Sequence, residues 1–269
     1  MSILNSHNYI IDTPFIISSY IREYDISKAN INILYKYGVL TKEQYEYYLT
    51  VDRYTRQRDI GIMQKDNKIV KILQQGILEA KKMFFEANNI DECDIIAIKN
   101  DAVFILNKIP TVTKFGNIEF INKNTYTSFY KLPYGLELYY YYDMVNNVEK
   151  LDVKGISEDK LKLHEEYFLE FLKVVLSSAQ MDNIEDTLDI VITFYDKYIK
   201  KELDLGYYRT FNSESVYCIR GNISDYNIYK AYFLEEHNKM DVDITHNLHI
   251  IRQLYQYYSS LHLSGVRKY

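Results

Sequence analysis

The sequence predicts an α+β fold in which a sheet-forming middle is preceded and followed by helices. β-prone runs separated by short turns gather between residues 94 and 142. Apolar residues recur with helical spacing between residues 66 and 88 and again after residue 157. Neither an internal repeat nor a low-complexity linker interrupts the chain. These patterns favour a mixed or antiparallel sheet with packed helices, followed by a mostly helical C-terminal region.

Composition indicates a globular chain in a reducing compartment. Hydrophobic residues make up 47% and charged residues 26% of the 269 residues. No apolar run approaches the ~20 residues that span a bilayer, and the N-terminus lacks a secretory pattern. Cys93 and Cys218 lie far apart and form no metal-type spacing. We therefore expect a cytoplasmic protein without a membrane partner, in the host cytoplasm if the source is viral.

In the N-terminal third, the spacing of apolar residues predicts an extended segment followed by four helices. Residues 7–24 carry enough alternating apolar residues to indicate extended structure, and the apolar spacing in 27–37 is helical. Thr41 and Gln44 form a capping-box pattern that starts a helix near residue 42. Residues 51–65 and 66–88 predict two further helices. The last helix carries an apolar stripe formed by Ile69, Ile72, Leu73, Gly76, Ile77, Ala80, Met83 and Phe84.

The middle third predicts a hairpin and several further strands. Residues 94–98 and 102–106 are β-prone runs on either side of a turn at Asn100-Asp101. Residues 118–120, 126–132 and 136–142 predict additional strands.

The rest of the chain predicts helices. Helical spacing marks residues 157–175, 183–203, 225–238 and 244–262. A change of character near Gly155 predicts two domains, residues 1–155 and 156–269.

Two aspartates stand where predicted strands end. Asp25 follows the first extended segment, and Asp101 lies in the turn of the hairpin. If these strands are neighbours in one sheet, the two carboxylates converge and offer the oxygen ligands that Mg²⁺ prefers. Two-metal phosphoryl transfer requires such convergence. The alternative is structural, because aspartate in a turn bonds nearby backbone and aspartate before a helix acts as an N-cap.

The segments around both aspartates resemble the palm of family B DNA polymerases of the phage and plasmid type. In that family the first palm motif is Asp-x-x-Ser-Leu-Tyr-Pro-Ser, and the matching stretch here is Asp25 to Asn32. The second motif is Asp-Thr-Asp-Ser-Val-Phe on a hairpin, and the matching stretch is Lys99 to Phe104. The resemblance implies that Asp25 and Asp101 are catalytic and hold Mg²⁺ or Mn²⁺.

Two further motifs follow in the family's order. The stretch from Lys123 to Tyr126 is similar to a Lys-Lys-Arg-Tyr element that contacts the nascent duplex. Lys154-Gly155 is similar to a Lys-Gly element that precedes the thumb. The resemblance covers roughly residues 20–175. It implies nucleic-acid contacts by Lys123, Tyr126 and Lys154, a palm-like domain over 1–155 and a thumb-like domain over 156–269.

The chain departs from the family at three places. The family's fingers motif is Lys-x-x-x-Asn-x-x-Tyr-Gly on a helix, and here helices within about 40–88 would form reduced fingers. Arg53 falls at the position of that motif's lysine and would face the triphosphate. Asn30 occupies the place of a tyrosine that excludes a ribose 2′-hydroxyl, which predicts weaker discrimination against ribonucleotides. Lys99 replaces the first aspartate of the hairpin motif and marks either an altered metal site or a lost activity.

These observations predict a polymerase-like nucleotidyltransferase. Its ligands would be a nucleoside triphosphate and a DNA or RNA primer-template or single strand. Two alternatives stay open. The palm could be an inactive binding or scaffold subunit of a viral replication or transcription assembly, or the chain could be an unrelated viral α+β interaction protein. The net charge of −5 weighs against a nucleic-acid binder, because such proteins are more often basic.

Overall fold

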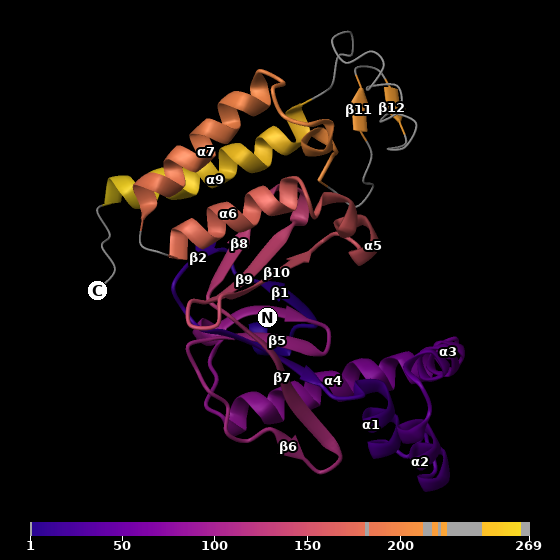
Figure 1. Ribbon diagram of the computed structural model, residues 1–269. Coiled ribbons are helices and arrows are strands. Elements are labelled where there is room, and N and C mark those ends of the chain that lie inside the picture. The colour runs from indigo at the N-terminus through magenta and orange to yellow at the C-terminus, as the bar shows by residue number, and fades with distance from the viewer. Residues whose placement is uncertain (1, 181–182, 212–216, 220–221, 225–243, 265–269) are drawn as a thin grey trace. The chain divides into compact units, whose positions relative to one another are not determined.

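The computed structural model describes residues 2–180, 183–211, 217–219, 222–224 and 244–264, and it confirms the α+β class (Figure 1). The chain divides into two compact units. The first unit comprises residues 1–12 and 19–126, and the second comprises residues 13–18 and 127–269. The predicted division after residue 155 therefore falls inside the second unit, because the strands between residues 128 and 154 pair with one another.

The first unit is built on a six-stranded antiparallel sheet with the strand order β1-β4-β5-β3-β7-β6. The central strand β3 pairs on one side with β5 and on the other with β7. The predicted hairpin is present as β4 and β5. The strands of this sheet are β1 (Asn8–Ile10), β3 (Ile21–Ile26), β4 (Ile95–Lys99), β5 (Ala102–Leu106), β6 (Lys114–Phe115) and β7 (Ile118–Tyr126).

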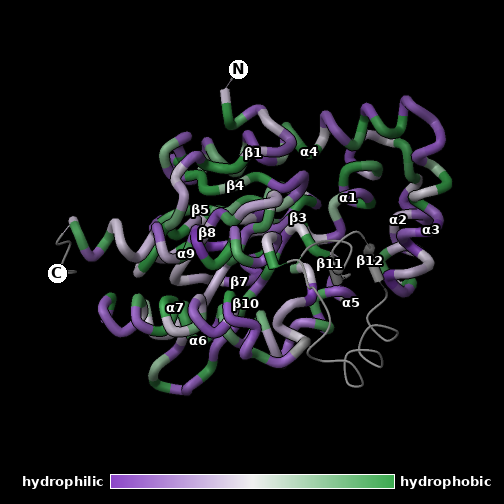
Figure 2. The backbone as a smooth tube through the Cα atoms, turned by 90° about the horizontal axis from the view of Figure 1, so that it is seen from above, coloured by the Kyte–Doolittle hydropathy of each residue, from purple (hydrophilic) through white to green (hydrophobic). Residues whose placement is uncertain are grey.

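Four helices accompany this sheet, as the sequence predicts. They are α1 (Ala29–Lys36), α2 (Lys42–Thr50), α3 (Arg53–Met63) and α4 (Asn67–Ala87). The Thr41–Gln44 capping box starts α2: the Gln44 backbone nitrogen donates to Thr41 Oγ1 at 3.3 Å, and Gln44 Oε1 accepts from the Thr41 backbone nitrogen at 2.9 Å. Figure 2 shows the contrast in hydropathy between β4, drawn mostly green, and α2, drawn mostly purple.

The apolar stripe of α4 packs against the sheet and α1. The Phe84 ring stacks on Phe120 of β7 with 4.1 Å between centroids, and it lies 5.4 Å from the Tyr24 ring of β3. At Gly76 any side chain would collide with Ile33 of α1, so α1 and α4 approach closely there. α2 and α3 reach the same core through Tyr48 and Ile60, so all four helices share one hydrophobic cluster, and the reduced fingers within about 40–88 stay a prediction.

The second unit contains a four-stranded antiparallel sheet and several helices. The sheet has the order β10-β9-β8-β2, formed by β2 (Phe15–Ile16), β8 (Ser128–Lys131), β9 (Glu137–Asp143) and β10 (Val148–Lys154). The helices are α5 (Glu158–Leu161), α6 (Phe168–Gln180), α7 (Ile184–Ile199) and α9 (Thr245–Ser264). Strands β11 (Tyr217–Ile219) and β12 (Asn222–Ser224) pair with each other.

Aromatic contacts join the sheet and the helices of the second unit. Phe171 of α6 stacks on Phe194 of α7 with 3.6 Å between ring centroids. The Tyr258 hydroxyl of α9 donates to the buried Tyr130 hydroxyl of β8 at 3.1 Å. Buried aromatic groups thus supply much of this core, which accounts for part of the unusual count of 29 tyrosines.

Three sequence predictions from residue 126 onwards differ from the structure or lie outside the described residues. The single strand predicted over 126–132 is two strands, since Tyr126 ends β7 and β8 begins at Ser128. The helix predicted over 157–175 is interrupted between α5 and α6. The helix predicted over 225–238 lies outside the described residues. No helix among the described residues is both long and apolar enough to cross a membrane.

His164 makes the stability of the second unit sensitive to acid. The ring is fully buried, and neither ring nitrogen has a hydrogen-bond partner among the described residues. Burial first, and then Arg209 and His246, lowers the pKa of His164 to about 3. Below pH ~6.5 this histidine is protonated in the unfolded chain but stays neutral in the folded chain. The free energy of unfolding therefore falls as the pH drops from 6.5 towards 3.

We expect the free energy of unfolding to decrease by about 2 kcal/mol between pH 7 and pH 5 because of this residue. Urea unfolding at the two pH values measures the loss. The variant His164→Leu should remove most of the difference, whereas His262→Leu at an exposed position of α9 should keep it. An unchanged difference in His164→Leu would contradict the assignment.

Candidate functional site

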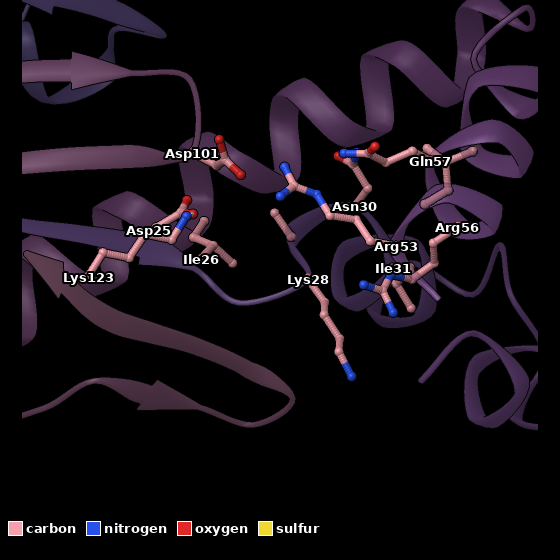
Figure 3. A pocket seen from close by; sticks show the side chains of 12 residues that line it. Asp25, Ile26, Lys28, Asn30, Ile31, Arg53, Arg56, Gln57, Asp101 and Lys123 are labelled. Carbon is pink, nitrogen blue, oxygen red and sulfur yellow. The ribbon is translucent and has the colours of Figure 1, made fainter. Parts of the chain in front are cut away.

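The pairing of β3 with β5 brings the two predicted aspartates together. Asp25 lies opposite Ala102 in the register, and Asp101 is the preceding residue in the turn. The Ile26 nitrogen donates to the Asp101 carbonyl oxygen at 3.4 Å. Asn100 supports the turn with φ 52°, a left-handed conformation that asparagine tolerates. Both carboxylates line one open pocket of the first unit (Figure 3).

Lys123 of β7 supplies the nearest positive charge. Its ammonium group forms an ion pair with Asp25 Oδ2, and 53% of the lysine side chain is exposed against 16% of the aspartate side chain. The other carboxylate oxygen, Asp25 Oδ1, is buried and has no hydrogen-bond partner among the described residues. A buried oxygen without a donor costs free energy, so Asp25 Oδ1 has room for one further partner, a donor or a cation.

The carboxylate of Asp101 is disfavoured in its charged form. Burial, and then the negative charge of Asp25, raises the pKa of Asp101 above its ordinary value, while Lys123 acts in the opposite direction. Two carboxylates that repel each other in a partly buried place are the arrangement that a divalent cation relieves.

Behind the turn lies Lys81, whose pairing with Lys82 in the sequence is typical of surface charge or of phosphate contacts, and which is buried instead. Its side chain is fully buried, and Nζ donates to the carbonyl oxygens of Ser6 at 2.7 Å and Asn100 at 3.0 Å. Burial lowers the pKa of Lys81 to about 8, and Asp101 opposes this shift. The sequence signal of this burial is its position on α4, four residues after Ile77, which places it beside the apolar stripe.

The opposite wall of the pocket comes from the start of α1 and from α3. Asn30, Arg53, Arg56 and Gln57 line it together with Lys28. Lys28 Nζ donates to the Leu49 carbonyl oxygen at 3.2 Å. Arg56 donates to the Val51 carbonyl oxygen at 2.8 Å, so it holds the loop before α3.

Arg53 is the cation on this wall that is available to a ligand. Its side chain is exposed and makes no hydrogen bond or ion pair with any residue that the structure describes. Figure 3 shows it extending from α3 towards Asp101. The pocket has a volume of about 270 Å³, near the lower end of small-ligand sites, and joins carboxylates on one wall to a guanidinium on the other. A metal-bound phosphate fits this polarity, since guanidinium matches phosphate oxygens.

The two carboxylates could hold one hard cation, but they do not by themselves make a complete site of protein ligands. Among the described residues, no group of three or more His, Cys, Asp or Glu side chains could hold a metal ion. Mg²⁺ is often bound through one or two carboxylates, with water and substrate phosphate filling the other positions. Asp25 and Asp101 meet this requirement, and Lys123 would have to release Asp25 Oδ2 or share it.

Five predicted site residues meet in this pocket, and two do not. Asp25, Asp101, Asn30, Arg53 and Lys123 all line it.

The two remaining residues lie elsewhere. Tyr126 is fully buried in the first unit, and its hydroxyl donates to Glu23 Oε2 at 3.0 Å, so its ring does not face a ligand. Lys154 belongs to β10 of the second unit, 3.9 Å from an Asp152 carboxylate oxygen, and its nucleic-acid contact stays a prediction.

Comparison with known protein families identifies the origin of the chain. A family model described as bacteriophage PBS1 gene 130 protein matches residues 1–259. The chain belongs to this phage family. No DNA polymerase family model matches the chain, and no curated protein matches it. The phage origin that the resemblance implied is thus supported, whereas the description of this phage family states no activity.

Proposed function

We propose that this phage protein is a metal-dependent, polymerase-like nucleotidyltransferase whose site is centred on Asp25 and Asp101. The observation that carries the proposal is the meeting of these two carboxylates in one pocket, with Asp25 Oδ1 buried and unpartnered and Arg53 facing them. The resemblance of the flanking segments to the family B palm supports the same assignment.

The cation would be Mg²⁺ or Mn²⁺, held by Asp25 and Asp101. Such a cation stabilises negative charge that develops on a phosphoryl group in transfer. Without a cation the pKa of Asp101 is raised. Cation binding would favour the ionised carboxylate and would therefore release a proton at pH values where the free site is still protonated.

Nucleotide recognition would come from the α1 and α3 wall. Arg53 would bind the phosphates, and Asn30 would lie closer to the sugar, where its amide can hydrogen-bond a hydroxyl. The nucleic acid would supply the attacking hydroxyl, and the protein's part would be positioning and charge stabilisation.

A second candidate is an inactive palm that binds nucleic acid or a partner subunit of a replication or transcription assembly. The ion pair between Lys123 and Asp25 favours it, because the ammonium already neutralises one carboxylate. In that case the site would bind nucleotide or nucleic acid without a divalent cation.

Iron-directed cleavage tests the cation site. Fe²⁺ replaces Mg²⁺ at carboxylate sites and, with ascorbate and peroxide, produces radicals that cut the nearby backbone. We expect cuts near residues 25 and 101, which excess Mg²⁺ suppresses. Cuts only elsewhere, or none, would reject the cation site and leave the inactive palm as the better candidate.

The transfer step is tested by extending a labelled primer on a template with Mg²⁺ and nucleoside triphosphates. We expect Arg53→Gln to weaken nucleotide use by about 10-fold or more, since a charged hydrogen-bond partner is lost. Arg58→Gln is the matched control, because Arg58 is engaged by Asp59 at 2.9 Å and lies outside the pocket. Equal effects of both substitutions would argue against a phosphate contact by Arg53.

A further inference from the structure

The turn between β8 and β9 carries a tyrosine where the backbone favours asparagine or glycine. The Leu132 nitrogen donates to the Leu136 carbonyl oxygen at 2.8 Å and closes the hairpin. Two of the three residues between them are left-handed, with φ 64° at Tyr134 and 71° at Gly135. Glycine and asparagine are favoured in this conformation because a Cβ is unfavourable at positive φ. A tyrosine at a position with this backbone cost is a candidate for a functional use of its ring.

The ring of Tyr134 is presented to solvent beside α9. Its residue is 52% exposed, yet the ring stacks on His246 with 4.0 Å between centroids and 11° between planes. His249, one turn further along α9, meets the ring nearly edge-on at 6.3 Å. Two histidine contacts therefore fix the plane of an exposed aromatic ring.

A pocket of about 360 Å³ borders this ring. Besides Pro133 and Tyr134, its lining consists of His249, Arg252, Gln253 and Gln256, which follow one face of α9 at helical spacing. None of the six lining residues is acidic. The pocket thus combines an aromatic wall with a guanidinium and two amides.

Arg252 is the charge of this pocket. It is exposed and forms no ion pair within the described part of the chain. The backbone of Gly155, which follows Lys154, also packs against the turn, since a Cβ on Gly155 would lie 2.7 Å from the Gly135 carbonyl oxygen. The predicted nucleic-acid residue Lys154 therefore stands next in sequence to a residue that contacts this turn.

We propose that this pocket of the second unit binds one base of a single-stranded nucleic acid, with the base stacked on Tyr134 and a phosphate on Arg252. Aromatic stacking accepts any base, and glutamine amides offer both donors and acceptors to a base edge. Local lining without carboxylates suits a polyanion, although the whole chain carries a net charge of −5. The proposal rests on the proposed function only for its ligand class, because the pocket uses none of the residues of the Asp25–Asp101 site.

Fluorescence anisotropy of a labelled oligothymidylate in EDTA tests the pocket. Tyr134→Asn removes the ring and leaves a residue that favours positive φ, so the turn should keep its conformation. We expect this variant to bind about 10-fold or more weakly, and Tyr134→Phe to bind within about 2-fold of the wild type. Arg252→Gln should reduce the slope of log affinity against log salt by about one.

The controls lie outside the pocket but in the same unit. Tyr255→Gln removes another exposed ring of α9, and Lys197→Gln removes a charge of α7. Both should bind within about 2-fold of the wild type. Circular dichroism should confirm that every variant is folded.

Three results would overturn the proposal: no binding by the wild type, equal binding by Tyr134→Asn, or an equal loss in Tyr255→Gln. The outcome is separable from that of the cation site. Oligonucleotide binding is measured in EDTA, without a divalent cation, so failure of iron-directed cleavage would leave this binding unaffected.

Discussion

Asp101→Asn is expected to stabilise the folded protein at neutral pH and to weaken divalent-cation binding strongly. Burial and Asp25 raise the pKa of Asp101 in the folded state, so the unfolded carboxyl ionises at lower pH than the folded one. The folded wild type therefore binds more protons, and its stability falls as the pH rises from ~3.9 through the raised pKa. Asparagine keeps the shape and removes the charge.

Urea unfolding measures the first part of this expectation. The variant should exceed the wild type in free energy of unfolding at pH 7, and the difference should vanish below about pH 4, where the wild-type carboxyl is protonated in both states. Glu119→Gln is the matched control, because Glu119 is exposed on β7 and the substitution removes the same charge. A destabilised Asp101→Asn at pH 7 would show that the carboxylate has a structural role instead.

Calorimetric titration with Mn²⁺ measures the second part. We expect affinity to fall by more than about 100-fold, because even groups that only orient a metal ligand change affinity by 10–100-fold. Gain of stability together with loss of binding is the signature of a functional residue, since sites selected for activity are often unfavourable for the fold. Unchanged Mn²⁺ affinity would remove Asp101 from the cation site.

Gly155→Ala is expected to destabilise the second unit strongly. Gly155 has φ 96°, and a Cβ there would lie 2.7 Å from the Gly135 carbonyl oxygen. A left-handed conformation costs an ordinary residue about 1–2 kcal/mol, and overpacking adds about 1–3 kcal/mol. We expect a loss of about 3 kcal/mol in the free energy of unfolding, measured by chemical denaturation.

Gly135→Ala is the matched control in the same unit. Gly135 has φ 71°, but nothing lies within 4 Å of a Cβ built there, so only the backbone cost of about 1–2 kcal/mol applies. Equal losses in the two variants would mean that the Gly135 backbone moves away without cost. A larger loss at Gly155 would show that the Lys154-Gly155 element has a packing role, which by itself explains its glycine.

Local elements were predictable because local residues determine them. The capping box at Thr41, the apolar stripe of α4 and the hairpin around Asn100 all depend on contacts within a few residues or one helix. β10 was missed as a strand, because Val148–Lys154 is rich in charged residues and owes its conformation to pairing with β9. Its alternation of polar and apolar residues is too weak to identify it alone.

The site was only partly predictable because its residues come from distant segments. Nothing in the sequence alone specifies that β3 lies between β5 and β7, although this order brings Asp25 to Asp101 and to Lys123. Tyr126 shows the opposite case: its motif position predicts a nucleic-acid contact, but its ring is fully buried and its hydroxyl donates to Glu23. Residue type and spacing do not specify which face of a sheet is buried by other parts of the protein.

Asp25 and Asp101 illustrate the difference between local signals and tertiary relations. Local signals predict that each aspartate lies near a strand end or in a turn, since β-prone runs and turn residues are recognisable within a few positions. The shared pocket of the carboxylates, the pairing of Lys123 with Asp25 and the support of the Asp101 turn by buried Lys81 become visible in the folded chain alone. The reason is that these relations depend on strand pairing and burial between residues far apart in the chain, whose free energies no local pattern contains.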